Sequence, residues 1–134
     1  MANNLQYSVA VNNARLDSIE STAGTAAHLK IYTGTQPANC ATAASGTLLV
    51  DMTLPSDWMN AASAGSKTKL GTWSGTGITS GTAGYFRITD TAGTNCHIQG
   101  TVGTTGTDMT LDNTSIATSQ VVTVNSFTIT CANQ

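Results

Sequence analysis

The sequence predicts a mainly β protein, an antiparallel β-sandwich or small barrel with one N-terminal helix. Only 9% of its 134 residues are charged, against about 25% in typical domains. Threonine is the commonest residue, and its branched side chain favours pleated, half-exposed strands. Polar and apolar residues alternate over several short segments, and turns rich in glycine separate these segments. Short strands with such regular spacing are typical of sandwiches and small barrels.

The segment 8–24 is the helix candidate. Val9, Leu16 and Ile19 recur at helical spacing and predict one apolar stripe. The charged side chains that fall away from this stripe are Arg15, Asp17 and Glu20. The cap candidates are Ser8 or Asn12 at the start and Gly24 after the end. Such a helix either covers one end of a β core or serves as an arm that docks on a neighbouring subunit.

Alternation with a period of two predicts the strands. The predicted strands are 28–33, 48–52, 67–74, 84–90, 94–102, 107–112 and 120–131. Residues 91–93 read as a hairpin turn, whereas 34–46 and 54–65 read as irregular loops. In the last strand the apolar phase slips at Asn125-Ser126, which indicates a β-bulge or a crossing between two sheets. The length fits one domain, divided into an N-terminal arm and helix (1–26) and a β-sandwich (27–134).

Charge and composition exclude several functional classes. The net charge is −2, and the five basic residues are scattered, so nucleic acid is not an expected partner. A polybasic run, an apolar membrane span and a secretory leader are all missing, so we expect synthesis in a cytoplasm and no membrane partner.

The residues that usually carry chemistry are dispersed along the chain. His28 and His97 have no nucleophile motif beside them. Cys40, Cys96 and Cys131 lack a CxxC pattern and read as small buried hydrophobes. A Cys96–Cys131 bridge could still form in an oxidising exterior.

The carboxylates show no catalytic or calcium-binding pattern. Five aspartates read as solvated turn residues: Asp51, Asp57, Asp90, Asp108 and Asp112. A calcium loop of the DxDxDG type is absent around Asp108. We therefore expect no metal, no cofactor and no enzymatic activity.

The resemblance to a known family rests on four segments. They read LKIYTGTQPANC, LLVDMTLPSDWM, AGYFRITDTAGTNCHIQGTV and DMTLDNTSIATSQVVTVNSFTIT. Together with the N-terminal MANNLQYS, these segments resemble small virion proteins of tailed phages over nearly the full length. The resemblance implies a component of a phage particle and carries over no functional residues.

The expected function is that of a capsid decoration (cement) protein, located in the virion, that binds the lattice of the major capsid protein as a homotrimer. The expected contact residues are Leu16 and Ile19 on the helix and Trp58 and Met59 on an exposed loop. One alternative is a tail or fibre component that binds a host glycan through a groove lined by Trp58, Trp73 and Tyr85, although core packing is the commoner use of these rings. Another alternative is a small hydrolase on a barrel.

Overall fold

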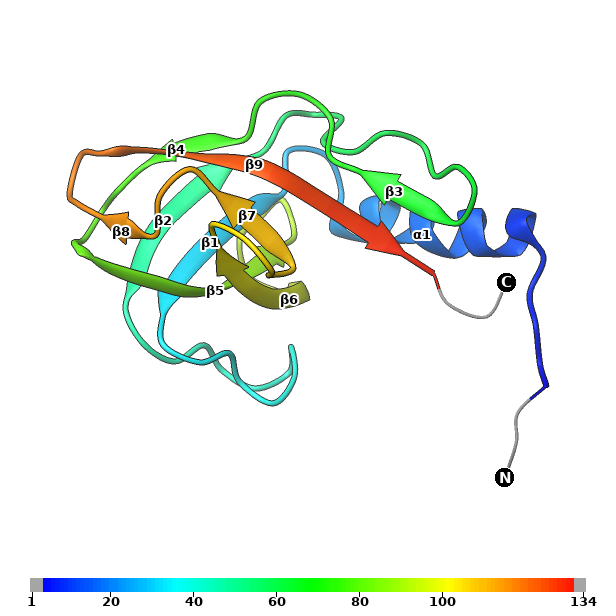
Figure 1. The fold of residues 1–134 in the computed structure, drawn as a ribbon, viewed down its shortest axis with the longest axis horizontal. Coiled ribbons are helices and arrows are strands. Elements are labelled where there is room, and N and C mark those ends of the chain that lie inside the picture. Colours follow the sequence, from blue (N-terminus) through cyan, green and yellow to red (C-terminus); the bar gives the residue numbers. More distant parts are fainter. Residues whose placement is uncertain (1–3, 132–134) are drawn as a thin grey trace.

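The computed structural model describes residues 4–131, and it contains one helix and nine strands within that range (Figure 1). The helix is α1 (Val9–Ala23). The strands are β1 (His28–Thr33), β2 (Leu48–Thr53), β3 (Ser66–Thr68), β4 (Ser74–Thr76), β5 (Gly81–Thr89), β6 (Cys96–Gly103), β7 (Met109–Leu111), β8 (Ser115–Ile116) and β9 (Val121–Thr130). The predicted class, mainly β with one N-terminal helix, is confirmed.

The strands form one curled sheet with the order β2-β1-β5-β6-β7-β9-β3, which makes a half-barrel. All neighbours in this path are antiparallel except β6 and β7, which are parallel. Strand β4 lies off this path and pairs with β9, and a bridge between Val50 and Gly77 joins the chain just after β4 to β2. The sheet therefore curls far enough to enclose a core.

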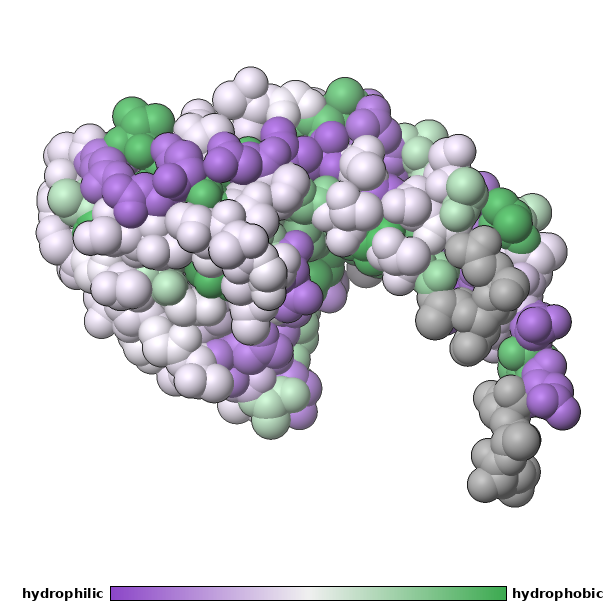
Figure 2. All heavy atoms as spheres, viewed as in Figure 1, coloured by the Kyte–Doolittle hydropathy of each residue, from purple (hydrophilic) through white to green (hydrophobic). Residues whose placement is uncertain are grey.

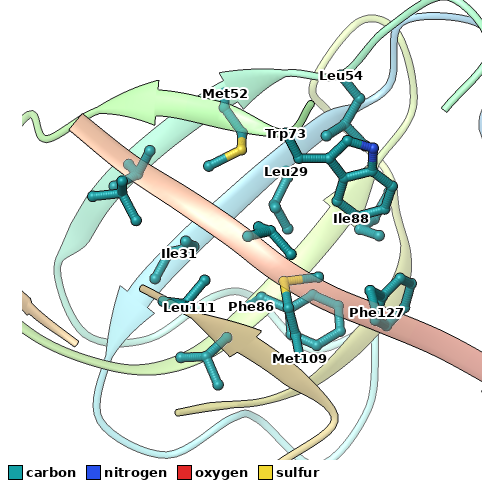
Figure 3. Close-up of a cluster of buried hydrophobic side chains, with 14 of the residues drawn as sticks. Leu29, Ile31, Met52, Leu54, Trp73, Phe86, Ile88, Met109, Leu111 and Phe127 are labelled. Carbon is teal, nitrogen blue, oxygen red and sulfur yellow. The ribbon is translucent and has the colours of Figure 1, made fainter. Parts of the chain in front are cut away.

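The inner face of the curled sheet holds the hydrophobic core. Leu29 and Ile31 on β1 meet Phe86 and Ile88 on β5, and all four are at most 1% exposed. Figure 3 shows Trp73 in this core with Phe86 from β5 and Phe127 from β9. The Trp73 and Phe127 rings pack with their centroids 5.8 Å apart. The Phe86 and Phe127 rings meet edge to face, with centroids 5.5 Å apart. Aromatic pairs of this kind add to the energy of burial.

Helix α1 begins and ends where the caps predict. The Ser8 hydroxyl accepts a hydrogen bond from the Val11 N–H at 3.2 Å. Gly24 follows the last turn with φ of 92°, and its N–H bonds the Glu20 carbonyl. The predicted apolar stripe is partly wrong, because Val9 is 46% exposed whereas Leu16 is buried. No helix in the described part of the chain is long and apolar enough to cross a bilayer.

One strand prediction differs from the structure, and two turn and bulge predictions are confirmed. The predicted strand 67–74 is divided into β3 and β4, because the chain leaves the sheet between them and Trp73 turns into the core. The bulge on β9 is confirmed: Thr110 pairs with Ser126 and Leu111 with Val124, so Asn125 is the extra residue. The hairpin turn at 91–93 is also confirmed by the bond from the Gly93 N–H to the Asp90 carbonyl.

Candidate functional site

A cleft of about 590 Å³ lies between β6, the end of β9 and helix α1. Three half-buried aliphatic side chains line it, one from each element: Ile98, Ile129 and Ile19. In Figure 1, α1, β3 and the end of β9 extend away from the half-barrel as a helix lobe. Figure 2 shows the hollow that separates this lobe from the half-barrel. The cleft thus combines these aliphatic side chains with polar residues of β6 and β9, and a strand lies on either side of it.

The β6 side of this cleft presents a free strand edge. The Thr101 N–H bonds the Asp108 carboxylate at 2.9 Å, so it points away from β5. Backbone groups alternate between the two edges of a strand, so Gln99 faces the same way. Among the described residues, β6 pairs with a second strand only at Val102 and Gly103. Residues 96–101 therefore pair with no described strand on this edge, where the Asp108 carboxylate already occupies the Thr101 N–H.

The β9 side presents a second free edge. The Phe127 carbonyl accepts from the Lys69 N–H, and the Cys131 N–H donates to the Gly65 carbonyl, so both groups face the β3 side. Thr128 and Thr130 alternate with them and line the cleft. Exposed edges of this kind are templates for another strand. The site that the structure offers is therefore suited to binding a polypeptide segment.

The N-terminal segment, residues 4–8, is extended and points away from the half-barrel and the cleft (Figure 1). Leu5 is 57% exposed, and Val9 and Val11 at the start of the helix are 46% and 45% exposed. The Arg15 guanidinium lies over the Tyr7 ring, with its carbon atom 4.8 Å from the ring centroid. Large exposed apolar side chains thus lie where the chain enters the helix.

Helix α1 is fixed to the protein by its carboxylates and not only by its apolar stripe. Glu20 Oε1 accepts from the N–H groups of Trp58 and Met59, both at 3.1 Å, and Oε2 lies 3.1 Å from Lys67 Nζ. Asp17 Oδ1 accepts from the Ala62 N–H at 2.9 Å and from Lys67 Nζ at 2.8 Å. These acids supply acceptors to the 58–62 backbone and so fix the helix that carries Ile19.

Lys67 stands at the centre of this anchor and is only 2% exposed. Its third partner is the Asn60 carbonyl at 2.8 Å. Burial opposes the Lys67 charge, yet hydrogen bonds to Asp17 and Glu20 raise the pKa of Lys67 above its usual value. The Lys67 hydrogen bond, with that of the Ala62 N–H, lowers the pKa of Asp17. Asp17 and Glu20, which fall away from the predicted apolar stripe, therefore hold the helix to the rest of the protein through Lys67.

The predicted contact residues divide into two groups. Leu16 lies on the buried side of the helix. Ile19 lines the cleft and packs against the core. The expectation of exposed Trp58 and Met59 is wrong, because they are 0% and 1% exposed. Glu20 and the Gly24 carbonyl, which accepts from Trp58 Nε1 at 2.9 Å, hold this loop inward. Of the four residues, only Ile19 is available at the candidate site.

The aromatic groove proposed for a glycan is not present either. Trp58, Trp73 and Tyr85 are each at most 1% exposed. The Trp58 and Trp73 rings pack on one another with centroids 5.9 Å apart. The Tyr85 hydroxyl donates to the Ser45 carbonyl at 2.6 Å and is covered by loop 34–46. These rings pack in the core or hold loops, which is the commoner of the two uses predicted.

The polar residues that are dispersed along the sequence make pairwise contacts with each other or with backbone groups. His28 Nδ1 bonds Asp51 at 2.8 Å, and Asp108 and Asp112 bond the backbone N–H groups of Thr101 and Thr123. Among residues 4–131, no group of three or more His, Cys, Asp or Glu side chains is arranged to hold a metal ion. These contacts hold strands and turns together.

The three cysteines are free, and Cys96 has a different neighbour from the one predicted. Its thiol interacts with Cys40, whereas Cys131 Sγ lies 3.7 Å from the Asn12 carbonyl beside the helix. The structure therefore does not bring Cys96 and Cys131 together as a pair. Burial, together with the Cys40 thiol, raises the pKa of Cys96 to about 12.

This shift predicts that Cys96 reacts slowly in the folded protein. The thiolate is the nucleophile, so a raised pKa leaves little reactive form at neutral pH. Alkylation of Cys96 by iodoacetamide should be on the order of a hundredfold slower in the native chain than in urea, with the native rate rising as pH approaches the pKa. Peptide mass spectrometry measures both rates. Equal rates in buffer and urea would contradict the raised pKa of this half-buried thiol.

The structure also shows which features of the site the sequence conceals. The free edges at Gln99, Thr128 and Thr130 depend on strand order and carry no side-chain signal. One feature of the sequence could have indicated the role of Lys67: this lysine occupies a strand position whose side chain faces inward. Comparison with protein-family models, curated proteins and solved structures gives no match for this chain.

Proposed function

We propose that this protein is a non-enzymatic structural subunit of a phage particle, a capsid decoration protein that assembles with copies of itself and binds the major capsid protein. The observation that carries the proposal is the cleft with two free strand edges, together with the projecting segment 4–8. An open edge beside an apolar cleft is normally covered, because it is otherwise an aggregation hazard. A structural subunit covers it by assembly.

The occupant we propose for the cleft is the N-terminal segment of a second copy. Residues 4–8 point away from their own half-barrel and cleft, so this segment is placed to reach the cleft of a neighbouring copy (Figure 1). Backbone hydrogen bonds to Gln99 on one side and Thr128 on the other would supply affinity, and Ile19, Ile98 and Ile129 would receive apolar side chains. A head-to-tail exchange closed by rotation gives a ring such as the expected trimer.

The low charge of the surface suits such lasting contact. Charged residues make up 9% of the chain, and depletion of charge characterises the buried centre of interfaces. Threonine keeps the strands wettable before assembly without the side-chain entropy of lysine or glutamate. Assembly then adds stability by mass action.

Sedimentation velocity tests the assembly step. The full chain should form a closed oligomer, whereas a variant lacking residues 1–7, which keeps the Ser8 cap, should be monomeric. Ile129→Arg, in the cleft, should also be monomeric. Val121→Arg is the matched control, since it changes an aliphatic residue on the same strand that is 62% exposed. A monomeric full chain, or unchanged assembly in both test variants, would contradict the proposal.

Copy number in purified phage particles tests the location. A decoration protein should be present on the order of several hundred copies, in proportion to the symmetric shell. Quantitative mass spectrometry against the major capsid protein measures this ratio. A few dozen copies or fewer would instead place the protein in the tail and overturn the decoration function.

A further inference from the structure

A second cleft, of about 580 Å³, lies on the outer face of the sheet, and its chemistry differs from that of the first. Loop 34–46 covers one side, the 91–95 turn the other, and β1 and β5 form the floor. Its lining includes the side chains of Lys30, Tyr32 and Arg87.

Two of the five basic residues of the chain therefore line one cleft in a protein whose net charge is −2. Aspartate and glutamate are absent from the lining residues that the structure describes. Within residues 4–131 neither Lys30 nor Arg87 has a carboxylate within 4 Å, since the ion pairs there belong to His28 and Lys67. Neither cation of this cleft therefore forms an ion pair within the described chain.

Arg87 shows the lack of a partner most clearly. It is only 5% exposed, and its Nη2 donates to the carbonyls of Asn39 and Thr42 at 3.2 and 2.7 Å. These bonds hold loop 34–46, but carbonyl groups carry no net charge. The Nε hydrogen is buried and has no acceptor in the described part of the chain. A buried cation without a counter-charge is costly, so an anion nearby would stabilise this arrangement.

Lys30 directs its charge to the same place. It pairs across the sheet with Arg87, so the two side chains lie on the same face of neighbouring strands. One donor of its ammonium group bonds the Gly93 carbonyl at 2.7 Å. Asp51, its other cross-strand neighbour, is bonded to His28 instead. An ammonium group has three donors, so Lys30 keeps capacity for a ligand.

We propose that this cleft binds a small ligand through an oxyanion group, a carboxylate, sulfate or phosphate held between Lys30 and Arg87. Charge-assisted hydrogen bonds from these two cations would fix the oxyanion. Neutral donors and acceptors surround them, from Tyr32, Thr94 and Asn95. Burial raises the pKa of Tyr32, so its hydroxyl stays neutral and does not repel an anion. This setting suits the hydroxyl groups of an acidic sugar.

Titration of the full-length protein with sodium phosphate, sodium sulfate and sodium glucuronate tests the proposal, with backbone amide resonances as the readout. Amides of Ala43, Thr94 and Asn95 should shift saturably, and higher salt should weaken the binding. Glucuronate binding more tightly than the two inorganic ions identifies the sugar as part of the ligand. Equal binding of all three identifies the oxyanion alone, and both results support the site.

Two variants and one control make the test specific. Lys30→Met should weaken binding about tenfold, the loss expected for one charged hydrogen bond. Ala43→Glu places a carboxylate in the exposed loop at the mouth of the cleft and should abolish binding without affecting the core. Lys69→Met removes a lysine elsewhere and should bind as the parent does. Absence of saturable shifts with every anion, or full binding by Ala43→Glu, would overturn the proposal.

Discussion

Replacing Trp58 by alanine should lower the free energy of unfolding by about 3–5 kcal/mol, the usual cost of removing a fully buried aromatic side chain. Trp58 is 0% exposed, and its ring packs against Trp73. Its Nε1–H also donates to the Gly24 carbonyl at the end of α1. The substitution therefore leaves a cavity in the core and removes a bond that fixes the helix.

Urea denaturation followed by circular dichroism measures this loss. Trp58→Phe fills most of the cavity and should lower the free energy of unfolding by less than Trp58→Ala does. The loss that remains relative to the parent reports the missing bond to Gly24 and the smaller ring. The control is Ile78→Ala, at a residue that is 53% exposed, and it should change stability by less than about 0.5 kcal/mol. If Trp58→Ala were as mild as Ile78→Ala, loop 54–65 would not be part of the core.

The burial of Trp58 illustrates where prediction from this sequence stops. An aromatic residue in an irregular segment has no periodicity that says whether it faces inward or outward. What decides the matter is Glu20, 38 residues earlier, whose carboxylate accepts the Trp58 N–H. A pairing of this range depends on the tertiary fold and has no local signal.

Local features could be predicted because their causes are local. Ser8 and Gly24 bound the helix through bonds within one turn, and the slip at Asn125 follows from apolar phase along a single strand. The orientation of Asp17 could not be predicted in the same way. An apolar stripe identifies the side of the helix that seeks the core, but it does not detect a neighbouring loop whose N–H groups need acceptors.

The candidate site was the least predictable part. Of the expected contact residues, Ile19 reaches the cleft, while the free edges of β6 and β9 arise from a strand order that no single segment specifies. The cation pair of the second cleft is concealed for the same reason. Lys30 and Arg87 are 57 positions apart in the sequence, and they meet only because β1 pairs with β5.

Lys67→Met should lower the free energy of unfolding by about 3 kcal/mol, the lower end of the cost of breaking a buried ion pair. Methionine keeps most of the packing of the lysine stem but leaves Glu20, Asp17 and the Asn60 carbonyl without their shared donor. The lower end applies because the Asp17 side chain is 46% exposed and regains water. Urea denaturation near neutral pH measures the difference.

The pH dependence of that difference separates the ion pair from simple packing. Asp17 has a pKa below its ordinary 3.8, so its contribution is present above pH 3.8 and is lost as pH falls through the depressed value. Lys67 has a pKa above its ordinary 10.5, so its contribution is present below pH 10.5 and is lost as pH rises through the raised value. The free energy of unfolding of the parent should therefore exceed that of Lys67→Met most between these limits. The two values should converge outside them.

Lys69→Met is the control. Among the described residues this lysine bonds only the Gly71 carbonyl and lies near the Trp73 ring. Its substitution should cause a small loss of stability that does not vary with pH. A loss for Lys67→Met that is constant from acid to alkaline pH would mean that the helix is anchored by packing, and not by charge.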